Sequence, residues 1–138
     1  MINRRNFLVS AGSVLVMPDV AFAADDVMYV PGVAEAAMDE GKVVFLDFWA
    51  SWCSTCAAQV RVLDKLRTEN PAYDRAITFI RVDWDDYGNG DLSRSLAIPR
   101  RSTLVALKGR RELGRIVAGT RENAIRQLLD TALDAAGA

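Results

Sequence analysis

The chain contains no histidine, and its 138 residues include only two cysteines and four prolines. It therefore lacks the side chain that most often serves as a base near neutral pH and as a metal ligand. Two cysteines alone also fall short of a closed zinc site, which takes four cysteine or histidine ligands. These absences leave the two cysteines as the most informative residues.

Long apolar runs and a strong net charge are also missing. The stretch from Phe7 to Met17 covers eleven residues, far fewer than the roughly 20 of a membrane-spanning helix. Seventeen basic residues nearly balance 18 acidic ones, for a net charge of −1. This balance suggests neither a nucleic-acid-binding protein nor a protein that binds anionic membranes.

Cys53 and Cys56 follow an apolar run at residues 43–48 and begin a predicted helix at residues 54–69. In the first turn of a helix, residues three apart are close enough for a disulfide. A thiol at that position also faces unpaired backbone N–H groups and the positive end of the helix dipole, which favour the thiolate. We therefore predict a redox pair in which Cys53 is the nucleophile and Cys56 resolves the mixed disulfide.

Other roles for this pair are less well supported. A disulfide closing so short a loop would stabilise the fold by only about 2 kcal/mol. Two inert core cysteines would not need Trp49 and Trp52 beside the turn, where the rings indicate a shaped, partly exposed surface. A different class of function, a copper(I) carrier or metallochaperone, could use two soft thiolates, but no Met-rich or His ligand set accompanies them.

The residues Asp-Phe-Trp-Ala-Ser-Trp-Cys-Ser-Thr-Cys at positions 47–56 resemble the active-site signature of the thioredoxin family. The Gly-Pro that this family places between its cysteines is replaced here by Ser54-Thr55. The resemblance implies that Asp47 is a buried acid that moves the proton of Cys56. Considered alone, Asp47 is a carboxyl within an apolar strand, where burial should raise its pKa unless the side chain reaches water.

Thioredoxins place a cis-proline opposite the cysteines, and two positions here could correspond to it. Ile98-Pro99 looks like the family's Ile-Pro run, but a gap-free count back from the strand at 103–107 places Ser102 there instead. We favour Ser102, with a trans peptide bond because a cis bond before a non-proline residue costs about 3–4 kcal/mol. Arg101 would then face the substrate, and Arg100 would add positive charge near Cys53.

Phe79 marks a second departure, because thioredoxins tend to keep a lysine there, near the buried acid. Without that cation, we expect Asp47 to be protonated more easily.

Residues 1–23 have the features of an export signal peptide. Arg4 and Arg5 precede the apolar stretch, and Ala21-Phe22-Ala23 has the small-x-small form of a cleavage site. The paired arginines resemble a twin-arginine motif, although general secretion remains an alternative. Cleavage would leave one domain, residues 24–138, with no membrane anchor.

The remaining chain alternates predicted strands and helices. We expect an edge strand within 25–30, strands at 43–48, 77–82, 103–108 and 112–117, helices at 32–40, 54–69, 92–97 and from 120, and a loop at 83–91. This order predicts an α/β thioredoxin fold, a central mixed β-sheet flanked by helices on both faces.

The sequence thus predicts a monomeric periplasmic thiol–disulfide oxidoreductase that reduces protein disulfides. We expect the catalytic residues to be Cys53, Cys56 and Asp47, and the substrate-binding residues to be Trp49, Trp52, Pro99, Arg101 and Ser102. No cofactor beyond the Cys53–Cys56 disulfide and no metal is expected, because the cysteines carry the electron pair. Substrates could be apocytochrome c, another oxidoreductase or a copper-site protein, and an upstream thiol must donate electrons.

Overall fold

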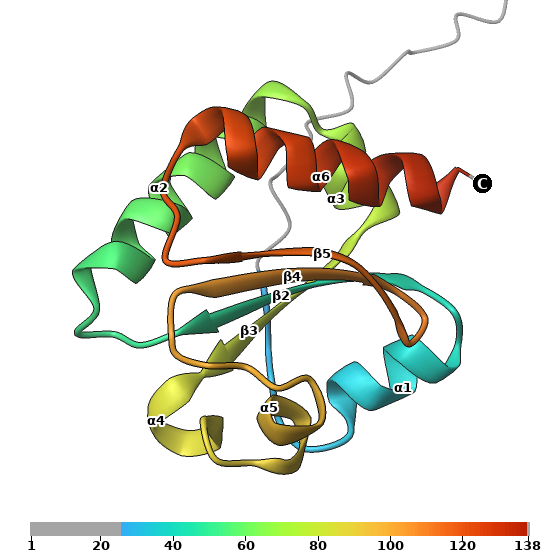
Figure 1. Cartoon of the computed structure of the whole chain (residues 1–138). Helices are drawn as coiled ribbons and strands as arrows, with labels where there is room; N and C mark the ends of the chain where they lie inside the picture. Colours follow the sequence, from blue (N-terminus) through green and yellow to red (C-terminus); the bar gives the residue numbers. More distant parts are fainter. Residues whose placement is uncertain (1–25, 138) are drawn as a thin grey trace, which may run out of the picture.

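The computed structural model describes residues 26–137, so the predicted export signal at residues 1–23 lies outside the described residues. Strands and helices alternate along the described chain (Figure 1). In order they are β1 (Val27–Met28), α1 (Val33–Asp39), β2 (Val43–Trp49), α2 (Ser54–Glu69), α3 (Ala72–Ala76), β3 (Thr78–Asp83), α4 (Trp84–Tyr87), α5 (Asp91–Ser95), β4 (Thr103–Lys108), β5 (Arg111–Val117) and α6 (Glu122–Ala136). No helix within this range is long and apolar enough to cross a membrane.

The five strands form one mixed sheet in the order β1-β3-β2-β4-β5. Strands β1, β2 and β3 are parallel, while β4 runs antiparallel to both β2 and β5. Helices α2, α3 and α6 cover one face of the sheet, and α1, α4 and α5 lie on the other (Figure 1). The predicted thioredoxin fold, a mixed sheet with helices on both faces, is confirmed.

Two apolar cores hold these layers together, because alternate residues of each strand point to opposite faces. On one face, β2 contributes Val43 and Phe45 to a core with α2, α3 and α6. On the other face, Leu46 and Phe48 pack with α1 and α5. Strand β2 is therefore buried on both sides, as its apolar sequence predicts.

Helix α2 and strand β4 have the predicted bounds, whereas two short helices were not predicted. Helix α3 begins directly after Pro71, whose fixed φ suits the start of a helix. The predicted loop at 83–91 is wrong over α4, because Asp83 accepts a hydrogen bond from the Asp85 N–H at 2.9 Å and caps a helical turn.

The sheet topology brings three segments together at one end of the sheet. Strands β2 and β3 are parallel and in register at Trp49 and Asp83, so both strands terminate at this end. Strand β4 is antiparallel to β2, with Thr103 opposite Phe48, so it starts there. The cysteine turn, α4 and the loop before Thr103 are consequently neighbours.

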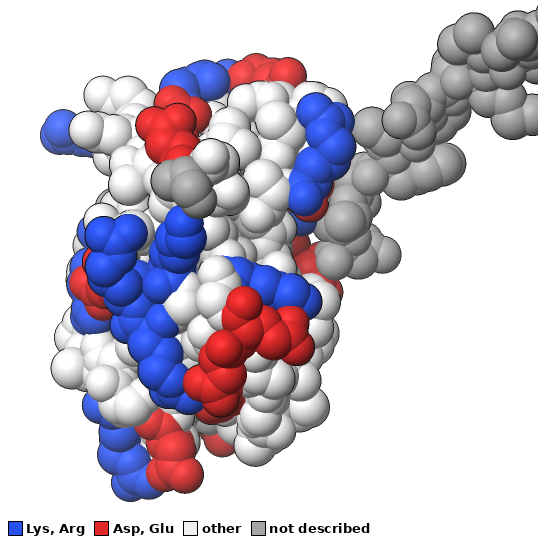
Figure 2. Space-filling view, turned by 90° about the vertical axis from the view of Figure 1, so that its right-hand side faces the viewer, with Lys and Arg blue, Asp and Glu red and all other residues white. Residues whose placement is uncertain are grey.

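The opposite end of the sheet carries the β4–β5 turn. Exposed ion pairs there join Arg110 to Asp39 and Lys42 to Glu40. Viewed from the right-hand side of Figure 1, basic and acidic side chains lie side by side on this face (Figure 2). Charges of both signs therefore mix on the face away from the cysteines.

Candidate active site

Cys53 and Cys56 form a disulfide at the N-terminus of α2, with their Cα atoms 5.2 Å apart. Cys53 is the N-cap residue, and its Sγ accepts a hydrogen bond from the Cys56 N–H at 3.1 Å. Cys53 is 4% exposed and Cys56 is fully buried. Cys53 is thus the more accessible sulfur, and a backbone N–H is placed to stabilise negative charge on it.

Ser102 lies directly against the disulfide. Its Oγ is 3.1 Å from the Sγ atoms of both Cys53 and Cys56, and its side chain is completely buried. Pro99 is exposed and lies three residues earlier in the loop. The gap-free count from β4 therefore corresponds to the observed arrangement, and no peptide bond within residues 26–137 is cis.

The backbone of Ser102 is held in a left-handed conformation, with φ of 62°. Its N–H donates to the Phe48 carbonyl at 2.7 Å, and its own carbonyl accepts from the Ala118 N–H at 2.8 Å. Gln59 Nε2 also donates to that carbonyl, at 3.0 Å, and to the Gly119 carbonyl at 2.9 Å. The loop is therefore tied to β2, α2 and the segment after β5.

Gln59 was missed by the sequence analysis. Val60, four residues after Cys56 and apolar, is only half-buried, whereas Gln59 is fully buried. A glutamine three residues after Cys56 lies on the same side of the helix as the sulfur, and this spacing was the available signal.

Asp47 lies behind the disulfide on β2 and is 3% exposed. Burial, the dominant effect, raises the pKa of Asp47 to about 7, and the nearby Arg81 guanidinium opposes that rise. The predicted burial of Asp47 is confirmed, and the direction of the pKa shift follows from it. A carboxyl with a pKa near neutrality can accept or donate a proton under ordinary conditions.

The residue at position 79 supplies no cation to Asp47, as expected, but Arg81 does. Arg81 pairs with Asp47 in the β2–β3 register, and its Nε lies 3.4 Å from Asp47 Oδ2. Phe79 is two residues earlier on the same side of β3, where its ring packs under the Arg67 guanidinium at 3.9 Å. The cation near the acid is thus supplied two residues further along β3 than the sequence comparison assumed.

Trp52, which is exposed, and Arg101, which is half-buried, lie at the rim of the site. The Trp52 side chain is 59% exposed, and the Arg101 guanidinium lies 4.4 Å from the centre of its ring. Trp52 Nε1 donates to the Asp85 carboxylate at 3.0–3.1 Å, a contact that fixes the ring against α4 and was not predicted. Trp49 is half-buried below the rim, with the Arg81 guanidinium 5.3 Å from its ring centre.

Residues 26–137 contain no cluster of three or more side chains suited to hold a metal ion. Other than the disulfide, the chemistry-bearing groups at the site are a buried acid, a buried hydroxyl and a cationic rim. This arrangement suits thiol–disulfide exchange, because Cys53 and Cys56 can alternate between two thiols and a disulfide, and Asp47 is a buried carboxyl that can exchange a proton.

Comparison with known proteins agrees with this chemistry. The Thioredoxin family model matches residues 32–131. A thioredoxin of Echinococcus granulosus is 30% identical over 95 residues, which cover 69% of this chain and 82% of that protein. A thioredoxin of Mycobacterium tuberculosis is 29% identical over 113 residues, covering 81% and 84% respectively.

Solved structures show the same fold. A structure titled Trxlp, from Edwardsiella tarda, has a TM-score of 0.65 and 24% identity and covers 75% of this chain and 98% of its own. The thioredoxin of Malassezia sympodialis has a TM-score of 0.64 and 23% identity, with coverage of 80% and 96%.

These matches favour thiol–disulfide exchange over the copper(I) carrier considered from sequence. With a redox-active Cys53–Cys56 pair at the start of α2 and a family match spanning residues 32–131, this chain belongs to the thioredoxin family of thiol–disulfide oxidoreductases.

Proposed function

We propose that this protein acts in the periplasm as a reductant of protein disulfides. The observation that carries the proposal is the Cys53–Cys56 pair at the N-terminus of α2, where the helix dipole and the Cys56 N–H favour a Cys53 thiolate. The export-type features of residues 1–23 support the location.

The first step is attack by the Cys53 thiolate on one sulfur of a substrate disulfide. The substrate S–S bond breaks, one substrate sulfur leaves as a thiolate and takes up a proton, and a mixed disulfide joins Cys53 to the other sulfur. The exposed Trp52 ring and the Arg101 guanidinium are placed to contact the substrate chain around that disulfide.

Cys56 completes the reaction. Its thiol passes a proton to the Asp47 carboxylate, and the resulting thiolate attacks Cys53 Sγ. The mixed disulfide breaks, the second substrate sulfur leaves, and two electrons have passed from the protein to its substrate. Turnover then needs an external thiol donor to reduce the Cys53–Cys56 disulfide, and no diffusible cofactor takes part.

The direction of transfer is inferred from the groups around Cys53. Strongly oxidising members of this fold stabilise the nucleophilic thiolate so far that the reduced form is favoured. Here Ser54-Thr55 separates the cysteines and the chain has no histidine, so no imidazolium contributes. We expect a reduction potential nearer to about −270 mV than to about −120 mV.

Equilibration of the mature chain with glutathione redox buffers tests the direction. A potential above roughly −180 mV would instead indicate an oxidase or isomerase. Substrates are identified by expressing a Cys56→Ser variant, which cannot resolve the mixed disulfide, and analysing the trapped partners by mass spectrometry. Partners trapped in periplasmic extracts support the proposal, while partners of cytoplasmic origin alone would contradict the location.

The export route has its own test. Replacing Arg4 and Arg5 together by lysine should leave the precursor in the cytoplasm if the twin-arginine route is used. Unchanged export of that variant would indicate the general secretory route. Retention of the unaltered protein in the cytoplasm would remove the periplasmic assignment altogether.

A further inference from the structure

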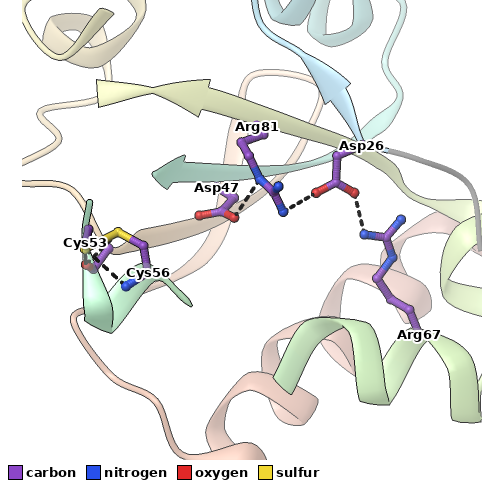
Figure 3. Close-up of polar contacts among 7 residues, drawn as sticks. Asp26, Asp47, Cys53, Cys56, Arg67 and Arg81 are labelled. Atoms are coloured by element: carbon purple, nitrogen blue, oxygen red, sulfur yellow. Dashed lines mark hydrogen bonds and ion pairs between the residues drawn. A yellow bond between two sulfur atoms is a disulfide. The ribbon is translucent and has the colours of Figure 1, made fainter. Parts of the chain in front are cut away.

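A buried chain of alternating charges connects Asp47 to the start of the described chain. Arg81 contacts Asp47, and Asp26 contacts both Arg81 and Arg67 (Figure 3). Arg67 in turn contacts Asp74. All of these side chains are at most 20% exposed. Screening by water is therefore weak along this chain, and each charge acts on the next.

The carboxylates of Asp26 and Asp47 interact with Arg81 unequally. Arg81 Nη2 donates to Asp26 Oδ2 at 2.9 Å, whereas Arg81 Nε lies 3.4 Å from Asp47 Oδ2 without forming a hydrogen bond. Among residues 26–137, neither carboxyl oxygen of Asp47 has a hydrogen-bond partner. A buried carboxylate that accepts no hydrogen bond is strongly disfavoured relative to its protonated, neutral form.

Asp26 is held in this position from both sides. Its Oδ1 accepts a hydrogen bond from Arg67 Nη1 at 2.5 Å, while its Oδ2 binds Arg81. Arg67 is itself anchored to Asp74 through Nε at 2.6 Å and stacks on the Phe79 ring. These ion pairs and the packing of Arg67 on Phe79 fix the position of Asp26 and keep it bound to Arg81.

We propose that Asp26 is a positioning residue for the disulfide chemistry: by binding Arg81 it keeps the guanidinium from forming a close hydrogen-bonded ion pair with Asp47, and so preserves the proton affinity of the buried acid. The inference rests on the proposed role of Asp47 in proton transfer. Asp26 itself touches neither the sulfurs nor the substrate, and it acts only through Arg81.

The charged groups that act on Asp47 all have known positions in the fold. Arg81 on β3 lowers its pKa, while Asp26 before β1 and the exposed Asp64 on α2 raise it. On β4 the residue opposite Asp47 is the apolar Leu104. Asp26 is the carboxylate that competes directly for Arg81, so removing its charge should change Asp47 more than any other single carboxylate does.

The test uses the oxidised protein and follows the Asp47 carboxyl carbon by NMR as pH is varied. In Asp26→Asn the Arg81 guanidinium loses its anionic partner at position 26 and can interact more strongly with Asp47. We expect the pKa of Asp47 to fall by about one pH unit or more, the lower end of the effect of a close arginine. An unchanged or higher value in the folded variant would overturn the proposal.

Asp74→Asn is the matched control. It removes one buried negative charge from the same network but contacts Arg67 rather than Arg81. We expect it to shift the pKa of Asp47 by less than half as much as Asp26→Asn does. Equal shifts in the two variants would show an effect of net charge alone, and the proposal would be wrong.

Should Asp26→Asn not fold, Arg81→Gln tests the same mechanism from the other side. Loss of the guanidinium should raise the pKa of Asp47, and an unchanged value would overturn the proposal. The readout does not depend on catalysis, so it remains valid if Asp47 has no role in proton transfer. If Asp47 does have that role, the pH at which mixed-disulfide resolution is half-maximal should fall in Asp26→Asn together with the pKa.

Discussion

The hydroxyl of Ser102 lies 3.1 Å from the Sγ of Cys53 and can donate a hydrogen bond to it. A proline at this position would offer no hydroxyl and no backbone N–H. In the reduced protein, the Ser102 hydroxyl adds to the Cys56 N–H as a donor that favours the Cys53 thiolate.

Replacing Ser102 by alanine should therefore make Cys53 less reactive. Hydrogen bonds to charged groups are worth about 1.5–3 kcal/mol, so we expect at least about a tenfold slower alkylation of Cys53 by iodoacetamide at pH 6. Ser93→Ala is a matched control, since Ser93 is equally buried but bonds to the Tyr87 carbonyl. Equal alkylation rates in the parent and Ser102→Ala would exclude this role of the hydroxyl.

Replacing Ser102 by proline should destabilise the fold. Proline cannot adopt the φ of 62°, and its missing N–H would leave the buried Phe48 carbonyl without this hydrogen bond. We expect the free energy of unfolding in urea to fall by at least about 2 kcal/mol. Ser102→Gly accepts a positive φ and keeps the N–H, so it should stay within about 1 kcal/mol of the parent. Parental stability in Ser102→Pro would contradict the backbone argument.

Replacing Asp47 by asparagine should slow the second step of the reaction. Asparagine cannot take the proton of Cys56, and general bases typically contribute about 10²-fold or more. Stopped-flow measurement of mixed-disulfide resolution at pH 7 checks this, with Glu69→Gln as an exposed carboxylate control on α2. A resolution rate unchanged in Asp47→Asn would remove Asp47 from the mechanism.

The same substitution should alter how stability depends on pH. Burial raises the pKa of Asp47 from 3.8 to about 7, so between these values the folded protein holds a proton that the unfolded chain has released. Its contribution to stability therefore falls as pH rises from about 4 to 7, by at most about 4 kcal/mol. Relative to the parent, Asp47→Asn should gain stability from pH 4 to pH 8. Urea unfolding of both proteins checks this, and a difference that is constant with pH would contradict it.

Arg101 should favour substrates with acidic residues beside their disulfide. Its guanidinium lies over the exposed Trp52 ring, at the rim of the site. For Arg101→Ala we expect kcat/KM to fall about two- to fivefold for an acidic peptide disulfide and less for a neutral one, with the difference shrinking at high salt. Arg111→Ala, exposed at the start of β5, is the control for net charge. Equal losses for both peptides would indicate that Arg101 only packs against Trp52.

The sequence alone was sufficient for the fold and for the reacting atoms. Apolar runs one strand long, helical spacing and turn residues predicted the order of the main strands and helices, because these signals are local. The spacing of Cys53 and Cys56 before a helix likewise predicted the disulfide, since two residues three apart in a helical turn are necessarily close. The short helix α4 was missed because one capping contact, from Asp83, stabilises it.

The surroundings of the disulfide were decided by the tertiary structure. Gln59 on α2 reaches Ser102, and Arg81 on β3 links Asp47 to Asp26 before β1, only because the parallel and antiparallel strand pairs align these segments. Arg81 lies beside Asp47 through the β2–β3 register, which no local pattern specifies. The cysteines follow from the chain itself, whereas the proton affinity of the acid behind them depends on contacts between residues up to 55 positions apart, as between Asp26 and Arg81.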